Sequence, residues 1–170
     1  MNEARRVQSM LGVLFVAIAA LAIAVGVWLR LTPAPPPQPA QPPREAKIYI
    51  PKVNPQGELT YESKPVAIQN PSAAYTEVFE TLIRESGVFP KGVRLLGATL
   101  QDGKLQLNFS QELTQNFEGG SDDEAALVNA ITSTAGSFPN VQRVEIRVEG
   151  KPIESLGGHI DLSQALPVNR

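Results

Sequence analysis

The sequence predicts an α+β domain that follows a transmembrane helix. Two segments with helical spacing carry one apolar stripe each, and a hairpin-like segment between them carries a single apolar face. These features favour a mostly antiparallel sheet with two helices packed on one face, in the order β-β-α-β-β-α-β. An uncharged apolar run near the amino terminus predicts the membrane helix.

The chain divides into four parts on this interpretation. Residues 1–9 form a short cytoplasmic tail, 10–30 a transmembrane anchor, 31–46 a Pro-rich linker and 47–170 the folded domain. The formal net charge of -2 does not suit a strongly basic nucleic-acid-binding protein. The absence of cysteine excludes disulfides, thiol catalysis and zinc–thiolate sites.

The anchor is the run Met10–Leu29, which contains no charged residue and has the length of about 20 residues that a spanning helix needs. Trp28 and Arg30 stand at its far end, where an aromatic ring and a charge favour the membrane interface. Arg5 and Arg6 precede it, and a short basic tail is easily retained in the cytoplasm. We therefore expect a single-pass protein of the cytoplasmic membrane with its domain on the extracytoplasmic side.

The segments around this anchor leave two alternatives open. Ala22 and Ala24 could form the cleavage site of a signal peptide, although the apolar run exceeds the about 7–15 residues usual for one. The linker segment Thr32–Ala46 is nearly half proline, which favours polyproline II and a semi-rigid spacer or tether. A proline-rich ligand for another protein is the alternative for this segment.

The folded domain is expected to begin with two strands, Lys47–Val53 and Glu58–Ile68, joined by a turn. Ile48 and Ile50 share one face of the first strand. Pro51 and Pro65 indicate that the strands are interrupted or lie near a sheet edge, because proline cannot donate a ladder hydrogen bond.

A helix is predicted over 70–86. Asn70 suits the N-cap and Pro71 the first helical position, and Gly87 ends the helix. Its apolar stripe consists of Tyr75, Val78, Phe79, Leu82 and Ile83.

The clearest hairpin spans 93–110, with Asp102 and Gly103 as a two-residue type I′ turn. The register that this turn sets gives three apolar pairs on one face: Leu100 with Leu105, Ala98 with Leu107, and Leu96 with Phe109. A one-residue slip would scatter this face, so the register is well specified.

A second helix is predicted from Ser121 to Phe138. Ser121 and Glu124 are expected to form a capping box, and Asp122 and Asp123 lie in the first turn, where negative charge suits the helix dipole. We interpret this acidic stretch as a helix start rather than a metal site. The buried stripe of this helix is expected to be Leu127, Ala130, Ile131, Thr134 and Ala135.

Alternation over 141–150 predicts a further strand. Its inward side chains are Val144, Ile146 and Val148. The charged side chains Glu145, Arg147 and Glu149 point outward and are the candidates for contact with a partner, although a solvated sheet face is the simpler interpretation. A last segment around His159–Leu162 is expected to add an edge strand.

The residues predict no catalytic, cofactor or metal site. His159 is the only histidine, and no motif places a nucleophile or an orienting group beside it. One histidine cannot form a multi-histidine metal site. We interpret His159 as a residue of a terminal turn and strand; the alternative is an enzyme in which Asp161 or Glu154 is its partner acid.

The order of motifs along the folded part resembles a known domain. The segment 89–113 has a proline–glycine lead-in, a hairpin and then a polar residue before an apolar–serine pair, and the segment 157–163 fits the expected ending. The most distinctive positions are Ser121, Glu124, Ile131, Thr134, Phe138, Pro139, Val141, Val144, Ile146 and Gly150. From about Lys47 to Leu166 the chain resembles the GerMN domain, the sporulation and spore-germination domain of bacterial envelope proteins. Asn108 stands where that domain usually has an aspartate, and the lipoprotein cysteine of many members is absent.

This resemblance implies an extracytoplasmic, non-enzymatic domain linked to sporulation, germination or envelope assembly. Some such domains resemble ring-building modules, which pack against copies of themselves or against partners. We therefore expect a membrane-tethered interaction or scaffold domain that binds envelope proteins or itself, without nucleic acid or cofactor. A peptidoglycan-binding module is the main alternative, and an envelope-polymer hydrolase is a further one.

Overall fold

The computed structural model describes residues 18–23, 25–26 and 45–170. Residues 18–23 and 25–26 are helical and exposed, and they belong to the expected anchor, most of which lies outside the described residues. Among the residues described, no helix is long and apolar enough to cross a membrane. The linker over 31–46 lies almost entirely outside them, so anchor and linker remain predictions.

The folded part confirms the predicted element order and adds short elements to it. The described elements are β1 (Glu45–Val53), β2 (Leu59–Ala67), the 3-10 turn η1 (Pro71–Ala73), α2 (Ala74–Ser86), β3 (Leu95–Gln101), β4 (Lys104–Phe109), α3 (Glu112–Gln115), α4 (Ser121–Gly136), β5 (Arg143–Val148), β6 (Lys151–Pro152) and β7 (Leu166–Pro167).

These strands form two sheets, so the prediction of a single sheet is wrong. Strands β1 and β2 pair only with each other, and the larger sheet has the order β3-β4-β5-β6, with β7 also paired to β5. The larger sheet is mixed because β4 and β5 run parallel, whereas its other pairs are antiparallel as predicted. A parallel pair needs a crossover connection, and α4 supplies it.

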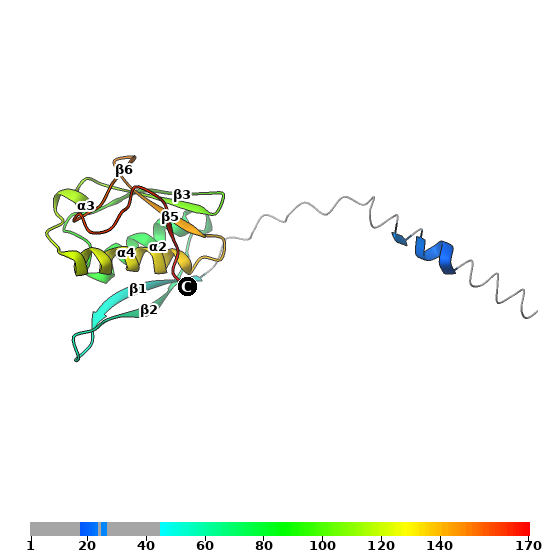
Figure 1. The fold of residues 1–170 in the computed structure, drawn as a ribbon, viewed down its shortest axis with the longest axis horizontal. Coiled ribbons are helices and arrows are strands. Elements are labelled where there is room, and N and C mark those ends of the chain that lie inside the picture. The colour runs from blue at the N-terminus through cyan, green and yellow to red at the C-terminus, as the bar shows by residue number, and fades with distance from the viewer. Residues whose placement is uncertain (1–17, 24, 27–44) are drawn as a thin grey trace, which may run out of the picture. The chain divides into compact units, whose positions relative to one another are not determined.

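Helices α2 and α4 lie between the two sheets, which gives the domain three layers (Figure 1). All residues of the stripe predicted for α4 are buried, and so are Ala126, Val128 and Thr132 on other sides of the helix. The prediction of one apolar face per helix was therefore too narrow for α4, because the helix packs against the hairpin as well as against the larger sheet.

The β1–β2 hairpin is bound to α4 through hydroxyl groups. The main-chain N–H of Lys47 donates to Ser137 Oγ over 3.1 Å, and that of Tyr49 donates to Thr134 Oγ1 over 3.1 Å. These bonds satisfy part of the edge of β1 that has no strand beside it. Ile48, between the two donors, is fully buried in the core.

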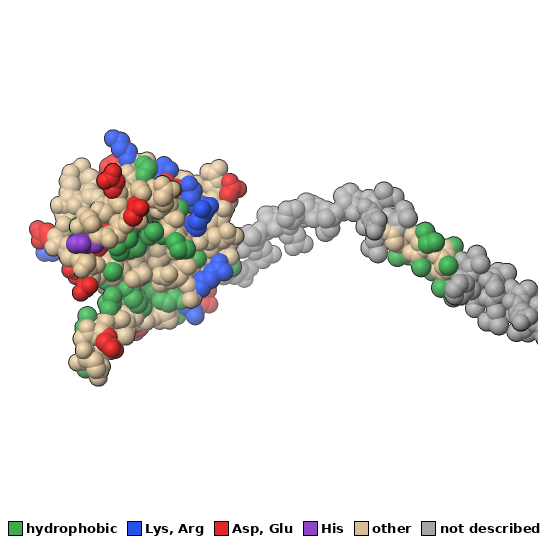
Figure 2. All heavy atoms as spheres, in the orientation of Figure 1, with side chains coloured by type: hydrophobic (Ala, Val, Ile, Leu, Met, Phe, Trp, Pro, Cys, Tyr) green, Lys and Arg blue, Asp and Glu red, His purple; other side chains and the backbone are tan. Residues whose placement is uncertain are grey.

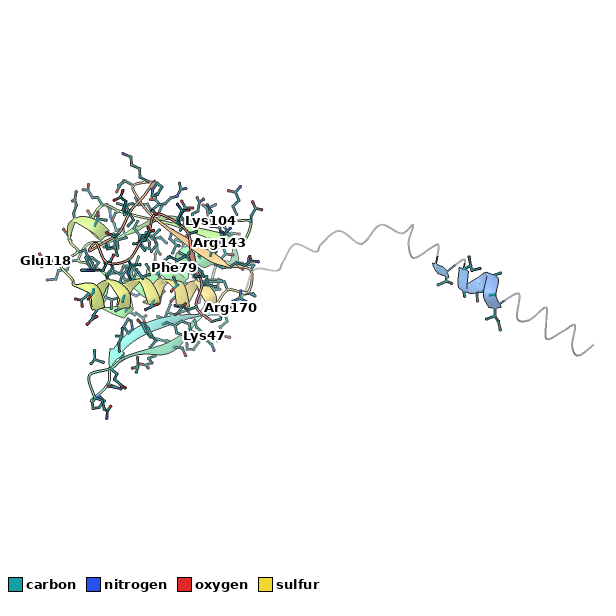
Figure 3. All side chains as sticks on the ribbon, in the orientation of Figure 1. Lys47, Phe79, Lys104, Glu118, Arg143 and Arg170 are labelled. Carbon is teal, nitrogen blue, oxygen red and sulfur yellow. The ribbon has the colours of Figure 1, made fainter. Side chains whose placement is uncertain are left out.

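The end predicted for the first helix is confirmed, whereas at its predicted start a 3-10 turn precedes the α-helix, which begins at Ala74. Asn70 Oδ1 accepts the N–H of Ser72 over 3.1 Å, so Asn70 caps the η1 turn that leads into α2. Gly87 closes the helix with a φ of 70°, a left-handed conformation that glycine adopts without strain. Phe79 of the predicted stripe is fully buried at the centre of the domain (Figure 3).

The register of the β3–β4 hairpin is confirmed near the turn and wrong at its far end. Leu100 pairs with Leu105 and Ala98 with Leu107, as predicted. A bulge at Leu96 then places Leu95 opposite Phe109 and leaves Leu96 45% exposed. A bulge inserts one extra residue into a strand, so the apolar side of the strand changes there.

The expected edge strand at 159–162 is absent from the structure. This segment is a loop, and the short strand β7 lies further along, where Leu166 pairs with Val144 of β5. The main-chain N–H of His159 donates to the buried carboxylate of Glu124 and not to a neighbouring strand.

Candidate functional site

The outer face of the larger sheet carries a compact charged cluster of Lys104, Glu145 and Arg147. Glu145 Oε2 lies 2.7 Å from Lys104 Nζ, and its Oε1 lies 2.7 Å from Arg147 Nε and 2.6 Å from Arg147 Nη2. The cluster forms because β4 and β5 are parallel and in register, with Lys104 beside Arg143 (Figure 3). Sequence reasoning missed Lys104 as a member because it expected no parallel pair.

The three residues predicted to face a partner differ in their exposure. Glu145 is only 8% exposed, Arg147 is half-buried and Glu149 is exposed. Burial alone would raise the pKa of Glu145, but hydrogen bonds from Lys104 and Arg147 outweigh this and hold the pKa below its ordinary value. Glu149 lies in the turn after β5 with a φ of 49°, and its Oε1 accepts the N–H of Gln111 over 3.1 Å. Contact of Glu145, Arg147 and Glu149 with a partner stays a prediction.

A polar hollow adjoins this cluster. It has a volume of about 210 Å³. Its lining residues are Gly97, Thr99, Gln106, Asn108, Arg147 and Gly150. Asn108 Oδ1 accepts the N–H of Gly150 over 2.7 Å, so this side chain supports the turn after β5. The hollow presents amide, hydroxyl and guanidinium groups, which suit hydrogen bonding to a polar ligand.

Glu124 is a buried carboxylate with a role that its position in the sequence did not predict. Its Oε1 accepts the N–H of Leu156 over 2.8 Å and its Oε2 accepts the N–H of His159 over 2.9 Å. The helix start is instead capped by Asp123, whose carboxylate accepts the N–H of Gly120 over 3.0 Å. The predicted capping box of Ser121 and Glu124 is therefore wrong.

The carboxylate of Glu124 is held in its charged form. Burial would raise its pKa, but main-chain N–H groups of the loop lower it below the ordinary value. The side chain is fully buried, and a buried charge of this kind is costly unless several donors surround it. Glu124 therefore connects α4 to the loop around His159.

The loop that carries His159 also carries the two acids considered as its partners. His159, Glu154 and Asp161 are exposed and line one open hollow of about 540 Å³, and the single histidine is visible on the surface in Figure 2. Asp161 Oδ1 accepts the hydroxyl of Ser163 over 2.6 Å, and this bond holds the pKa of Asp161 below its ordinary value. No group of three potential metal ligands occurs among the described residues.

Comparison with known proteins identifies the family of this domain. Residues 47–154 match the Germane family, described as sporulation and spore germination. No curated protein matches the chain.

Three solved structures share the fold. The first GerMN domain of the sporulation protein GerM from Bacillus subtilis is 18% identical, with a TM-score of 0.53, and the match covers 72% of this chain and 96% of that one. The tandem GerMN domains of the same protein are 21% identical with a TM-score of 0.54; the match covers 74% of this chain and 45% of theirs. A protein from Clostridium perfringens assigned as a lipoprotein is 20% identical, with a TM-score of 0.50 and coverage of 72% and 86%.

The family match spans well over half of the chain and ends within the loop that precedes His159. It covers the helices α2 and α4, the β1–β2 hairpin from Lys47 onward, and the strands that carry the charged cluster. The resemblance inferred from the order of the motifs is confirmed: the chain belongs to the sporulation and spore germination (Germane) family.

Proposed function

We propose that this protein is a membrane-tethered, non-catalytic interaction domain of the bacterial cell envelope, of the sporulation and spore-germination type, held on the extracytoplasmic side. The observation that carries the proposal is the order of its parts: an uncharged run over Met10–Leu29, a proline-rich segment, and then a Germane domain. The fold that it shares with a protein assigned as a lipoprotein and with a sporulation protein supports a place in the envelope.

A role in binding rather than catalysis is supported by the polar clusters of the domain. The carboxylate of Glu124 is enclosed by main-chain N–H donors, and that of Glu145 is paired with Lys104 and Arg147. The open hollow around His159 holds acids that are exposed and, in the case of Asp161, bound to a neighbouring serine. General acid–base chemistry needs groups held against a reacting bond, and these features do not build such a centre.

The topology can be tested by labelling single cysteines, because the chain has none of its own. Glu118 is exposed at one end of the domain (Figure 3), and Glu3 lies in the expected cytoplasmic tail. Glu118→Cys should react with a membrane-impermeant maleimide in intact cells, whereas Glu3→Cys should react only after lysis. The reverse pattern would overturn the proposed orientation, and release of the protein from membranes by alkaline carbonate would overturn the proposed tether.

Its partners can be identified by crosslinking the full-length protein in living cells and analysing the tagged product by mass spectrometry. Recovery of envelope-assembly or division proteins is expected. Recovery of cytoplasmic proteins alone would contradict the proposed location.

A second candidate function, binding of peptidoglycan, is favoured by the polar hollow beside Arg147. Its hydroxyl and amide groups are of the kind that bind sugar hydroxyls and peptide groups. Co-sedimentation of the protein with purified cell wall tests this candidate. Binding that is lost on Gln106→Ala would support it, whereas no co-sedimentation would remove it.

A further inference from the structure

The tip of the β1–β2 hairpin presents an apolar pair to solvent. Val53 is 72% exposed and Leu59 is 41% exposed. The two residues are paired in the register, so their side chains lie next to each other on one face of the hairpin. They are two of the three exposed large apolar side chains within residues 45–170, and the third is Leu96 of β3.

The tip is held in one conformation by Asn54. Its Oδ1 accepts the N–H groups of Gln56 and Glu58 over 3.0 and 2.8 Å, and its Nδ2 donates to Glu58 Oε2 over 2.9 Å. The distal end of the hairpin projects from the body of the domain (Figures 1 and 2). Binding through this tip would therefore cost little conformational entropy.

A groove between α2 and β3 offers the complementary surface. It has a volume of about 410 Å³. Its apolar floor is formed by Ile83, Val93 and Leu95, and its rim carries Glu80, Arg84 and Arg94. Strand β3 is an edge strand of the larger sheet, since it pairs only with β4. The exposed Leu96 belongs to the same strand.

The charges of the tip and the groove are opposite in sign. The groove rim has two arginines and one glutamate, and Arg84, whose side chain is 65% exposed, has its Nη2 3.5 Å from Glu85 Oε1. Glu85 is itself paired with Lys64 over 2.6 Å, so the rim keeps a net positive charge. The tip has Glu58 and Glu62 against Lys52, and the Lys52–Glu62 ion pair is a loose one of 3.9 Å. A cationic rim around an apolar floor suits an apolar pair flanked by carboxylates.

We infer that the hairpin tip of one copy of this protein docks in the α2–β3 groove of the next copy. The inference rests on the proposed function, because it names the partner of the proposed interaction domain. The two surfaces differ, so the association is heterologous and builds a ring or a filament rather than a two-fold dimer. Val53 and Leu59 become buried on Ile83 and Leu95, with the arginines facing the acidic side chains of the tip.

Paired cysteines in the full-length protein test this arrangement in isolated membranes. Val53→Cys places a thiol at the tip and Glu80→Cys places one at the groove rim. With a short bis-maleimide crosslinker, the double variant should give a ladder of oligomers, and each single variant should stay monomeric. Co-expression of the two single variants should give dimers and nothing larger, because each copy then has one reactive surface. As a matched control, Val53→Cys combined with the exposed position Gln142→Cys should give no ladder.

Charge reversal tests the groove separately from the thiols. Arg84→Glu with Arg94→Glu should reduce the crosslinked product of the double-cysteine protein by about tenfold or more. Glu62→Lys in the same chain should restore part of it. Unchanged crosslinking after the arginine reversal would contradict a role for the charges of the rim.

Two results would overturn the inference. One is that the double-cysteine variant gives only monomers with the crosslinker, although both of its thiols react with a monofunctional maleimide. The other is crosslinking of the Val53→Cys single variant to dimers, which would mean that the hairpin tips of two copies contact each other. A monomeric protein that still captures other envelope proteins in living cells would retain the proposed function and lose only this inference, so the two fail separately.

Discussion

Glu124 illustrates how one buried carboxylate can determine the position of a whole loop. It binds main-chain N–H groups of Leu156 and His159, in a part of the chain that forms no regular strand. Its folded-state pKa lies below the ordinary value of 4.5. A carboxylate with a lowered pKa contributes stability that is present above its unfolded pKa and lost as the pH falls through the folded one.

We therefore predict that the protein loses stability as the pH falls below about 4.5, and that Glu124→Gln removes part of this loss. Glutamine keeps the shape but replaces one acceptor oxygen by an NH₂ group that faces other donors. The expected destabilisation at neutral pH is about 2 kcal/mol, because bonds to a charged acceptor are lost. Urea unfolding of the full chain in detergent at pH 7 and pH 4 measures both quantities. Equal pH dependence in the two proteins would contradict the assignment; Asp122→Asn, at an exposed position, is the control.

The sequence could not distinguish this role from helix capping. Ser121 and Glu124 have the spacing of a capping box, and Asp123 is equally able to cap the helix. The choice depends on a loop more than thirty residues away, which brings its N–H groups to Glu124. By contrast, the caps at Asn70 and Gly87 are local, and both were predicted correctly.

Strand β3 provides a prediction at the scale of elements. Leu95 packs against the core and Leu96 is exposed, because the bulge changes which side chain faces inward. Leu95→Ala should cost about 2 kcal/mol of unfolding free energy, and Leu96→Ala about 0.5 kcal/mol or less. Urea unfolding of the two variants checks this difference. The reverse order would favour the unbroken register that the turn alone predicts.

The β1–β2 hairpin, which forms its own layer, provides another prediction at the scale of elements. Thr134 accepts the N–H of Tyr49, so Thr134→Val keeps the volume of the side chain but leaves that N–H without its acceptor. A loss of about 1–2 kcal/mol is expected. Amide hydrogen exchange at Tyr49 should become faster than it is in the unchanged protein, and the increase should exceed that at Ile146, which lies in the larger sheet. If Thr134→Val changed neither stability nor exchange, the hydroxyl would not be what binds the hairpin to α4.

Element type was more predictable from the sequence than element pairing. Alternation and turn residues correctly indicated β1, β2, β4 and β5, because these signals are local. The division into two sheets depends on what lies beside each strand, and the alternation of β1 is the same whether it joins the larger sheet or packs on the helices. The buried residues on other sides of α4, such as Val128, are the one sequence feature that suits a helix between two layers.

At the scale of the whole molecule, the family was predictable because its motifs occur in order over most of the folded part. The charged cluster was not, since Lys104 and Glu145 are distant in the sequence and meet only through the parallel pair of β4 and β5. The partner surface inferred here likewise joins residues of the first hairpin to residues of α2 and β3. Such surfaces follow from the packing of elements and carry no local sequence pattern.

The predicted linker allows a last prediction about how the domain depends on the segment before it. The described residues 45–170 belong to one compact unit, and the core of that unit consists of residues from Ala46 onward. Replacing 32–41 by a glycine–serine segment of equal length should therefore leave the unfolding midpoint of the domain unchanged within about 1 °C, whereas Leu107→Ala in the core should lower it by several degrees. Circular dichroism of the full chain in detergent measures both. Because a flexible segment has a shorter mean span than polyproline II, the same replacement should also reduce crosslinking to envelope partners in living cells. A large fall in the unfolding midpoint would mean instead that the linker packs on the domain and is not a spacer.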